Sequence, residues 1–181
     1  MTDNDPIMED QHLVAEAKKD IRAFNALYLK YVQPLYRYTL SRIGTKVEAE
    51  EAVSQTFLAA LEGFPNYRDD GRFAAWLFSI ARRKTADHFR SSKRTADLAE
   101  NLPSIEMDLQ MQAEQHDHKT HLTALLHTLP EEEQELLRLR YAANLNFDEI
   151  GKLTSLTPDA AKKRLYRLLD RLHIQLEGSN D

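Results

Sequence analysis

Large apolar side chains recur every three or four residues through the first part of the chain, which is the period of a helix buried on one side. The pattern predicts a short helix around residues 13–17, a long helix over about residues 21–40 and a third helix over residues 48–61. Pro34 falls inside the long helix, so we expect a bend there. The Gly- and Pro-containing segment PNYRDDGR, residues 65–72, predicts a loop after the third helix.

A strongly apolar helix predicted for residues 73–90 completes a first helical domain at residues 11–94. Residues 95–118 contain few large apolar side chains and show no clear period, so we expect a flexible linker there. Helical periodicity returns in residues 119–177 and predicts a second helical domain. The predicted fold is therefore all-α, with two small helical domains joined by an acidic linker. A disordered N-terminus and a short tail account for the remainder: residues 1–10 and residues 178–181.

Residues 147–173 combine a short apolar-faced helix, a Thr/Ser-rich turn and a longer helix opened by Thr157 and Pro158. Such a helix-turn-helix binds DNA by placing its second helix in the major groove. Apolar side chains follow one side of that helix and leave five cations outside: Lys162, Lys163, Arg164, Arg167 and Arg171. We assign base contacts first to Arg164 and Arg167, because the planar guanidinium donates two bonds to guanine, and phosphate contacts to Lys162 and Arg171. The alternative is an ordinary solvated basic helix face.

Composition limits the class of protein. The chain has five glycines in 181 residues and no cysteine, which favours helices and excludes a disulfide framework and thiolate zinc sites. No apolar stretch has the length of a membrane span, and the acidic N-terminal residues do not resemble a secretory signal. We therefore expect a cytoplasmic protein without membrane insertion.

A net charge of −5 argues against a nucleic-acid partner, but the charges are segregated along the chain. Residues 68–94 contain eight Lys and Arg against three Asp, whereas residues 95–118 contain six acidic residues and no Lys or Arg. Because affinity for a duplex depends on phosphate neutralisation, we expect weak binding to free DNA by the chain alone. Stronger binding requires a larger partner that supplies further contacts, which indicates a subunit.

Five segments, in this order, resemble the sigma-70 family of bacterial RNA polymerase sigma factors, specifically the extracytoplasmic-function (ECF) group. They cover nearly the whole chain: AFNALYLKYVQPLYRY, AEEAVSQTFLAAL, FAAWLFSIARRKTADHFR, LPEEEQELLRLRY and LNFDEIGKLTSLTPDAAKKRLYRLLDRL. The resemblance implies a dissociable specificity subunit of core RNA polymerase. Its first domain would bind the polymerase clamp and capture the melted −10 element of promoter DNA. Its second would recognise the −35 element as duplex through the five cations of the longer helix, Lys162, Lys163, Arg164, Arg167 and Arg171, here called the −35 set. The linker would run through the polymerase interior towards the RNA exit path.

The resemblance also implies two further sets of contact residues. The −10 set lies in the loop and the helix after it: Asn66, Tyr67, Arg68, Arg72, Arg83, Lys84, Asp87 and Arg90. The clamp set lies on an acidic helix: Glu48, Glu50, Glu51, Ser54, Gln55 and Phe57. Tyr67 is the expected stacking partner for an extruded base, whereas Trp76 is expected to pack in the core.

Several positions depart from the family pattern. Arg83 stands where many members have Asn, so we expect it to contact the DNA backbone rather than a base. Ser54 and Gln55 stand where Gln and an acid are common, which predicts weaker clamp affinity or tuning by another partner. Gly151 stands where Ala is common; its small size still permits close helix packing, and it is expected to cost roughly 1 kcal/mol of helix stability.

Two other classes of function compete with this interpretation. An ordinary helix-turn-helix repressor or activator would bind a palindromic site tightly without polymerase. An enzyme would need an acid–base pair, but Glu50 and Glu51 point about 100° apart on a helix. A histidine-rich run includes His116, His118 and His121, whose spacing does not suit one helical face, so we expect no metal and no cofactor. Exposed amphipathic surfaces predict an inhibitory partner, an anti-sigma protein.

Overall fold

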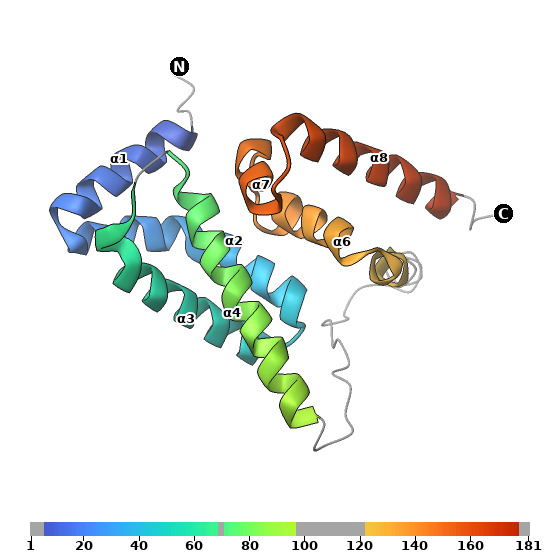
Figure 1. The fold of residues 1–181 in the computed structure, drawn as a ribbon, viewed down its shortest axis with the longest axis horizontal. Helices are drawn as coiled ribbons and strands as arrows, with labels where there is room; N and C mark the ends of the chain where they lie inside the picture. Colours follow the sequence, from blue (N-terminus) through green and yellow to red (C-terminus); the bar gives the residue numbers. More distant parts are fainter. Residues whose placement is uncertain (1–5, 69–70, 97–121, 178–181) are drawn as a thin grey trace, which may run out of the picture. The chain divides into compact units, whose positions relative to one another are not determined.

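The computed structural model describes residues 6–68, 71–96 and 122–177, and every regular element within these ranges is helical (Figure 1). The chain divides into two compact units, residues 1–105 and residues 106–181. This confirms the expected all-α class with two small helical domains. Most of the expected linker, the C-terminal tail and the histidine-rich run lie outside the described residues.

The described part of the first unit is built from four α-helices and two short 3-10 turns. In chain order they are α1 (Pro6–Lys19), η1 (Ile21–Ala23), α2 (Phe24–Ile43), α3 (Lys46–Gly63), η2 (Phe64–Asn66) and α4 (Phe73–Ala96). Helices α2, α3 and α4 pack on one another through a common apolar core. Its fully buried side chains include Leu27, Leu35, Tyr38, Phe73, Leu77 and Phe78.

Helix α1 begins at Pro6, so residues 6–10 are helical and not part of a disordered N-terminus as expected. The reason is a buried polar contact that the sequence pattern did not reveal. Asp10 is only 4% exposed; it accepts a hydrogen bond from the Tyr31 hydroxyl and lies 2.8 Å from the Lys30 ammonium. Glu9 lies 2.7 Å from the same ammonium. Burial lowers the pKa of Lys30, but its bonds to Asp10 and Glu9 outweigh this effect and raise it.

Helix α2 continues as one helix through Pro34, the residue at which a bend is expected. Proline removes one backbone donor from a helix interior. Tyr31 and Leu35 on either side of it are both buried, so tertiary packing holds the helix on each side of the lost bond.

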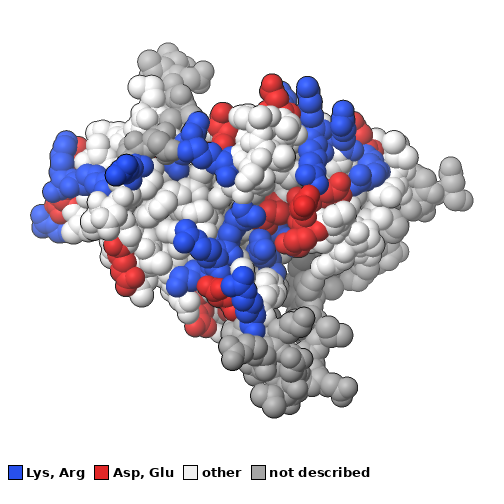
Figure 2. Space-filling model, viewed as in Figure 1, with Lys and Arg blue, Asp and Glu red and all other residues white. Residues whose placement is uncertain are grey.

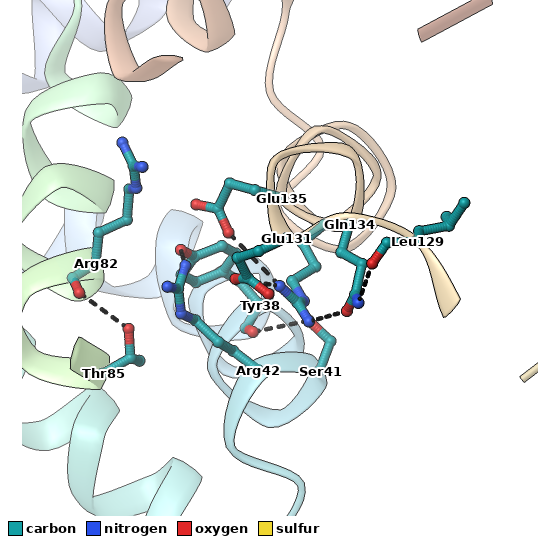
Figure 3. Close-up of polar contacts among 10 residues, drawn as sticks. Tyr38, Ser41, Arg42, Arg82, Thr85, Leu129, Glu131, Gln134 and Glu135 are labelled. Carbon is teal, nitrogen blue, oxygen red and sulfur yellow. Dashed lines mark hydrogen bonds and ion pairs between the residues drawn. The ribbon is translucent and has the colours of Figure 1, made fainter. Parts of the chain in front are cut away.

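The described part of the second unit is helical from residue 122 to residue 128 and then forms four named elements. These are α6 (Glu131–Leu137), the π-helical turn η3 (Arg138–Ala142), α7 (Phe147–Thr154) and α8 (Pro158–Glu177). The core contains Leu136, Leu139, Leu145, Ile150 and Leu168. Gln134 ties α6 to the preceding segment, because its side-chain amide donates to the Leu129 carbonyl at 2.9 Å (Figure 3).

No helix among the described residues is long and apolar enough to cross a membrane. The same part of the chain contains no cluster of three His, Asp or Glu side chains placed to hold a metal ion.

Candidate nucleic-acid interface

The helix-turn-helix expected from the sequence is formed by α7 and α8. Helix α7 starts with a capping box: the Asn146 side chain accepts from the Glu149 backbone N–H at 2.9 Å, and the Glu149 carboxylate accepts from the Asn146 N–H at 2.8 Å. The helix ends at Ser155, whose φ of 59° is left-handed. Capping at both ends fixes where α7 stops, and therefore where α8 begins.

Gly151 is required by the turn between these helices. Its carbonyl accepts from the N–H of Ser155 and, at 3.0 Å, from the N–H of Leu156. These bonds bring the turn so close that a Cβ at position 151 would lie 2.7 Å from the Leu156 carbonyl oxygen. This agrees with the expected close packing at Gly151, and it shows that the close neighbour is the backbone of the turn.

Helix α8 buries one face and exposes another. Ala161, Leu165, Leu168 and Leu172 are buried against the rest of the unit. Lys162, Lys163 and Arg167 are exposed, and no described residue forms an ion pair or hydrogen bond with their side chains. Figure 2 shows Lys and Arg side chains gathered along α8, with acidic side chains beside them.

The other two cations of the −35 set are paired with glutamates of α6. Arg164 lies 2.6 Å from Glu132, and Arg171 forms the equivalent pair with Glu133 one helical heptad further on. These glutamates lie in the first turn of α6, where negative charge also complements the helix dipole. Arg164 therefore already has an acidic partner, whereas Arg167 has none among the described residues.

The −10 set divides into exposed and buried residues. Asn66 and Arg68 are exposed at the start of the loop. Tyr67 between them is only 8% exposed and packs against the rings of Trp76 and Phe73, at centroid distances of 4.6 and 5.7 Å. The assignment of Tyr67 as a stacking partner for an extruded base does not agree with this position, since both neighbouring rings belong to the protein.

The remaining members of the −10 set lie around and along α4. Arg72, just before the helix, is half-buried. Arg83, Asp87 and Arg90 follow one exposed stripe of α4, and Arg90 lies 3.0 Å from Asp87. Lys84 is half-buried beside this stripe. The stripe therefore carries a surplus of positive charge on the side of α4 away from its buried face.

The clamp set lies on α3 and is mostly exposed. Ser54 donates to the Glu50 carbonyl at 3.0 Å, and the Gln55 amide donates to the Glu51 carboxylate at 3.0 Å. Glu48 is more constrained, because it accepts from the Thr45 hydroxyl and lies 3.6 Å from His88 of α4.

Phe57 differs from the rest of the clamp set, since it is only 7% exposed and its ring lies 4.7 Å from that of Tyr28. The exposed large apolar side chains on this side are others that the sequence pattern did not identify: Tyr28, Leu58 and Leu61. Their helical positions beside the buried stripe of an amphipathic helix were the signal from which their exposure could have been predicted.

A family model described as Sigma-70 region 2 matches residues 27–95, and one described as Sigma-70, region 4 matches residues 121–172. The ECF RNA polymerase sigma factor SigD of Mycobacterium tuberculosis is 32% identical over 179 residues, covering 93% of this chain and 84% of SigD. The chain belongs to the ECF sigma factors. SigM of Bacillus subtilis, another ECF sigma factor, is 29% identical over 158 residues, covering 86% of this chain and 96% of SigM.

Two solved structures have the same fold as this ECF sigma factor. CnrH in complex with the cytosolic domain of CnrY matches with a TM-score of 0.67 at 21% identity, covering 93% of this chain and 97% of CnrH. RpoE of Bartonella quintana in complex with the anti-sigma factor NepR matches with a TM-score of 0.65 at 19% identity, covering 85% and 96% of the two chains.

Family membership gives the two units their roles. An ECF sigma factor directs promoter-specific transcription initiation by RNA polymerase, with region 2 and region 4 as its two functional parts. Region 2 here contains α2, α3 and α4, and therefore both the clamp set and the −10 set. Region 4 contains the helix-turn-helix and the −35 set. Helix α1 precedes the residues that the region 2 model matches.

Proposed function

We propose that this sigma factor catalyses no reaction of its own and acts in the cytoplasm by holding core polymerase and two promoter elements together. The observation that carries the proposal is the exposed face of α8, where Lys162, Lys163 and Arg167 project without a partner among the described residues. A basic helix presented in this way by a capped helix-turn-helix suits the major groove.

Within region 4, we assign the direct base contact first to Arg167. Its guanidinium is exposed and available for two bonds to a guanine edge. Lys162 and Lys163 lie nearer the start of α8 and supply phosphate contacts as point charges. Arg164 and Arg171 add positive charge from the side of α8 that faces α6, where they pair with Glu132 and Glu133.

Within region 2, we assign capture of the −10 element to Asn66 and Arg68 at the exposed start of the loop. Arg72 and the α4 stripe of Arg83, Asp87 and Arg90 provide the adjoining surface, along which the phosphates of the opened strand are neutralised. The buried rings of Phe64, Tyr67 and Phe73 support this loop from inside and do not themselves stack on DNA.

We assign polymerase binding to the exposed part of the clamp set together with the apolar side chains beside it. Glu50 and Glu51 present negative charge, and Leu58 and Leu61 present apolar surface on the same helix. A surface with an apolar centre and a charged rim is typical of a protein–protein interface. The same surface is available to an anti-sigma protein, a partner class that appears with the structurally similar RpoE.

The test of this assignment begins with the chain and core polymerase reconstituted on a promoter library. Mapping of transcript starts should reveal shared elements upstream, which then define the cognate promoter. Arg167→Ala is expected to relax base preference at one position of the −35 element by about 1–3 kcal/mol. Lys162→Ala should weaken binding to all sequences and reduce the salt dependence of log K by about 1.

Lys19→Ala, which removes the same charge from α1, is the matched control and should leave the −35 preference unchanged. An unchanged preference in Arg167→Ala, combined with a relaxed preference in Arg164→Ala, would return the base contact to Arg164. Specific start sites that do not depend on either element would contradict the proposal as a whole.

A further inference from the structure

Lys18 connects α1 to the loop of the −10 set, although it precedes the residues that the region 2 model matches. Its ammonium donates to the carbonyl oxygens of Phe64 at 2.6 Å and Pro65 at 3.1 Å, 46 and 47 residues further along the chain. The ammonium also lies 4.8 Å from the centre of the Phe64 ring. One side chain of α1 thus contacts both the backbone and a ring of η2.

The end of α3 is a place where a cation is stabilising. The last carbonyl groups of a helix lack partners within it and carry the negative end of the helix dipole. Pro65 supplies no N–H with which to continue the helix. The Phe64 carbonyl accepts from the Tyr67 N–H at 3.1 Å, which closes η2, and its second lone pair accepts from Lys18.

The geometry of η2 decides where the loop begins. Asn66 is its last residue, and Arg68 follows after the buried Tyr67. Tyr67 is fixed in the aromatic core. A rotation of the Phe64 and Pro65 carbonyl groups would therefore change the direction of the Asn66 side chain, which precedes Tyr67, and of the Arg68 side chain, which follows it. These are the two exposed residues assigned above to capture of the −10 element.

We propose that Lys18 is a positioning residue, which fixes η2 against α1 and thereby holds Asn66 and Arg68 ready for the opened −10 strand. The inference rests on the function proposed above for this loop. A contact that only stabilised the unit would weaken polymerase binding and every DNA contact together. Positioning instead predicts a selective loss of −10 opening.

The chain offers a matched control in the adjacent residue. Lys19 has the same charge and the same helix, but its ammonium pairs with Glu16 at 2.8 Å and not with η2. The experiment therefore compares full-length Lys18→Ala, Lys18→Arg and Lys19→Ala. Amide hydrogen exchange of residues 64–68 is measured on the chain without DNA. Permanganate reactivity of the −10 thymines is measured in reconstituted holoenzyme on a promoter identified by start-site mapping.

Lys18→Ala is expected to raise exchange at residues 64–68 and to slow −10 opening about tenfold, at equal holoenzyme occupancy and with unchanged binding to −35 duplex. Lys18→Arg should restore most of the rate, because a guanidinium can donate to both carbonyls. Lys19→Ala should behave like the unaltered chain in both measurements.

Unchanged exchange at residues 64–68 in Lys18→Ala would overturn the inference. Faster exchange in Lys18→Ala with unchanged −10 opening would also overturn the inference, provided that Arg68→Ala slows opening. An equal loss of core binding, −35 binding and −10 opening would show a merely structural role and overturn it as well. If neither Lys18→Ala nor Arg68→Ala affects opening, the function proposed for the loop fails and the positioning role fails with it.

Discussion

Replacing Gly151 by alanine sets two physical effects against each other within the helix-turn-helix. Alanine is a better helix former than glycine by about 1 kcal/mol, so propensity alone predicts a more stable α7. The structure places the new Cβ 2.7 Å from the Leu156 carbonyl oxygen, and 3.4 Å from the Pro158 nitrogen. Both neighbours are backbone atoms of the turn, so neither can move without moving the start of α8.

The size of the expected destabilisation follows from the contacts that the turn would lose. Overpacking of a well-packed site costs about 1–3 kcal/mol. The Gly151 carbonyl also accepts from Ser155 and Leu156, and each such bond contributes about 0.5–1.5 kcal/mol. After the gain in propensity is subtracted, we expect Gly151→Ala to lower the unfolding free energy of the second unit by about 1–2 kcal/mol.

The assay must distinguish the two units. Trp76, the one tryptophan of the chain, lies in the first unit, so its fluorescence in a urea titration should be unaffected. Hydrogen exchange at residues 147–172 reports the second unit and should become faster. Binding to −35 duplex in the holoenzyme should weaken in parallel, because α8 is displaced.

Gly63→Ala is the matched control in the other unit. A Cβ there would contact only the Trp76 ring, at 3.4 Å, and Gly63 has a helical φ of −80°. We expect this replacement to be neutral or stabilising by up to about 1 kcal/mol. Slower exchange at residues 147–172 in Gly151→Ala would show that propensity outweighs the close approach and would refute the reasoning.

Two other replacements test particular ion pairs. Glu132→Gln removes the acidic partner of Arg164 and a negative charge beside α8. We therefore expect tighter binding to −35 duplex by up to about fivefold and a steeper salt dependence of that binding, with little change in stability. A salt titration of the holoenzyme checks this, and weaker binding would show that Glu132 is needed to orient Arg164. Lys30→Met leaves the buried carboxylate of Asp10 without its cation, which should lower the unfolding free energy of the first unit by about 1.5–3 kcal/mol in urea titrations followed by Trp76 fluorescence. Asp10→Asn added to Lys30→Met should recover part of that loss, and an additive loss in the double variant would contradict the explanation.

The sequence by itself determined the class of fold and the order of its helices. Periodic apolar residues mark α3 and α4, and a polar N-terminal boundary followed by an apolar face marks α8, because the helical repeat is a local property of the chain. The same local information identified the helix-turn-helix and the family resemblance. Helical periodicity predicted the exposed cations of the −35 set on α8, whereas the −10 set and the clamp set came from what the family resemblance implies.

Only the tertiary structure decided which of those residues are available to a partner. From the sequence alone, Tyr67 and Phe57 could be either exposed or buried. Packing of Tyr67 against Trp76 and of Phe57 against Tyr28 buries both. The polar contacts of Asp10 and Arg164 join residues at least 20 positions apart. Such pairings depend on how helices pack, and the periodicity of the chain carries no information about them. The sequence therefore predicted the candidate surfaces, while the fold decided which of their side chains are exposed.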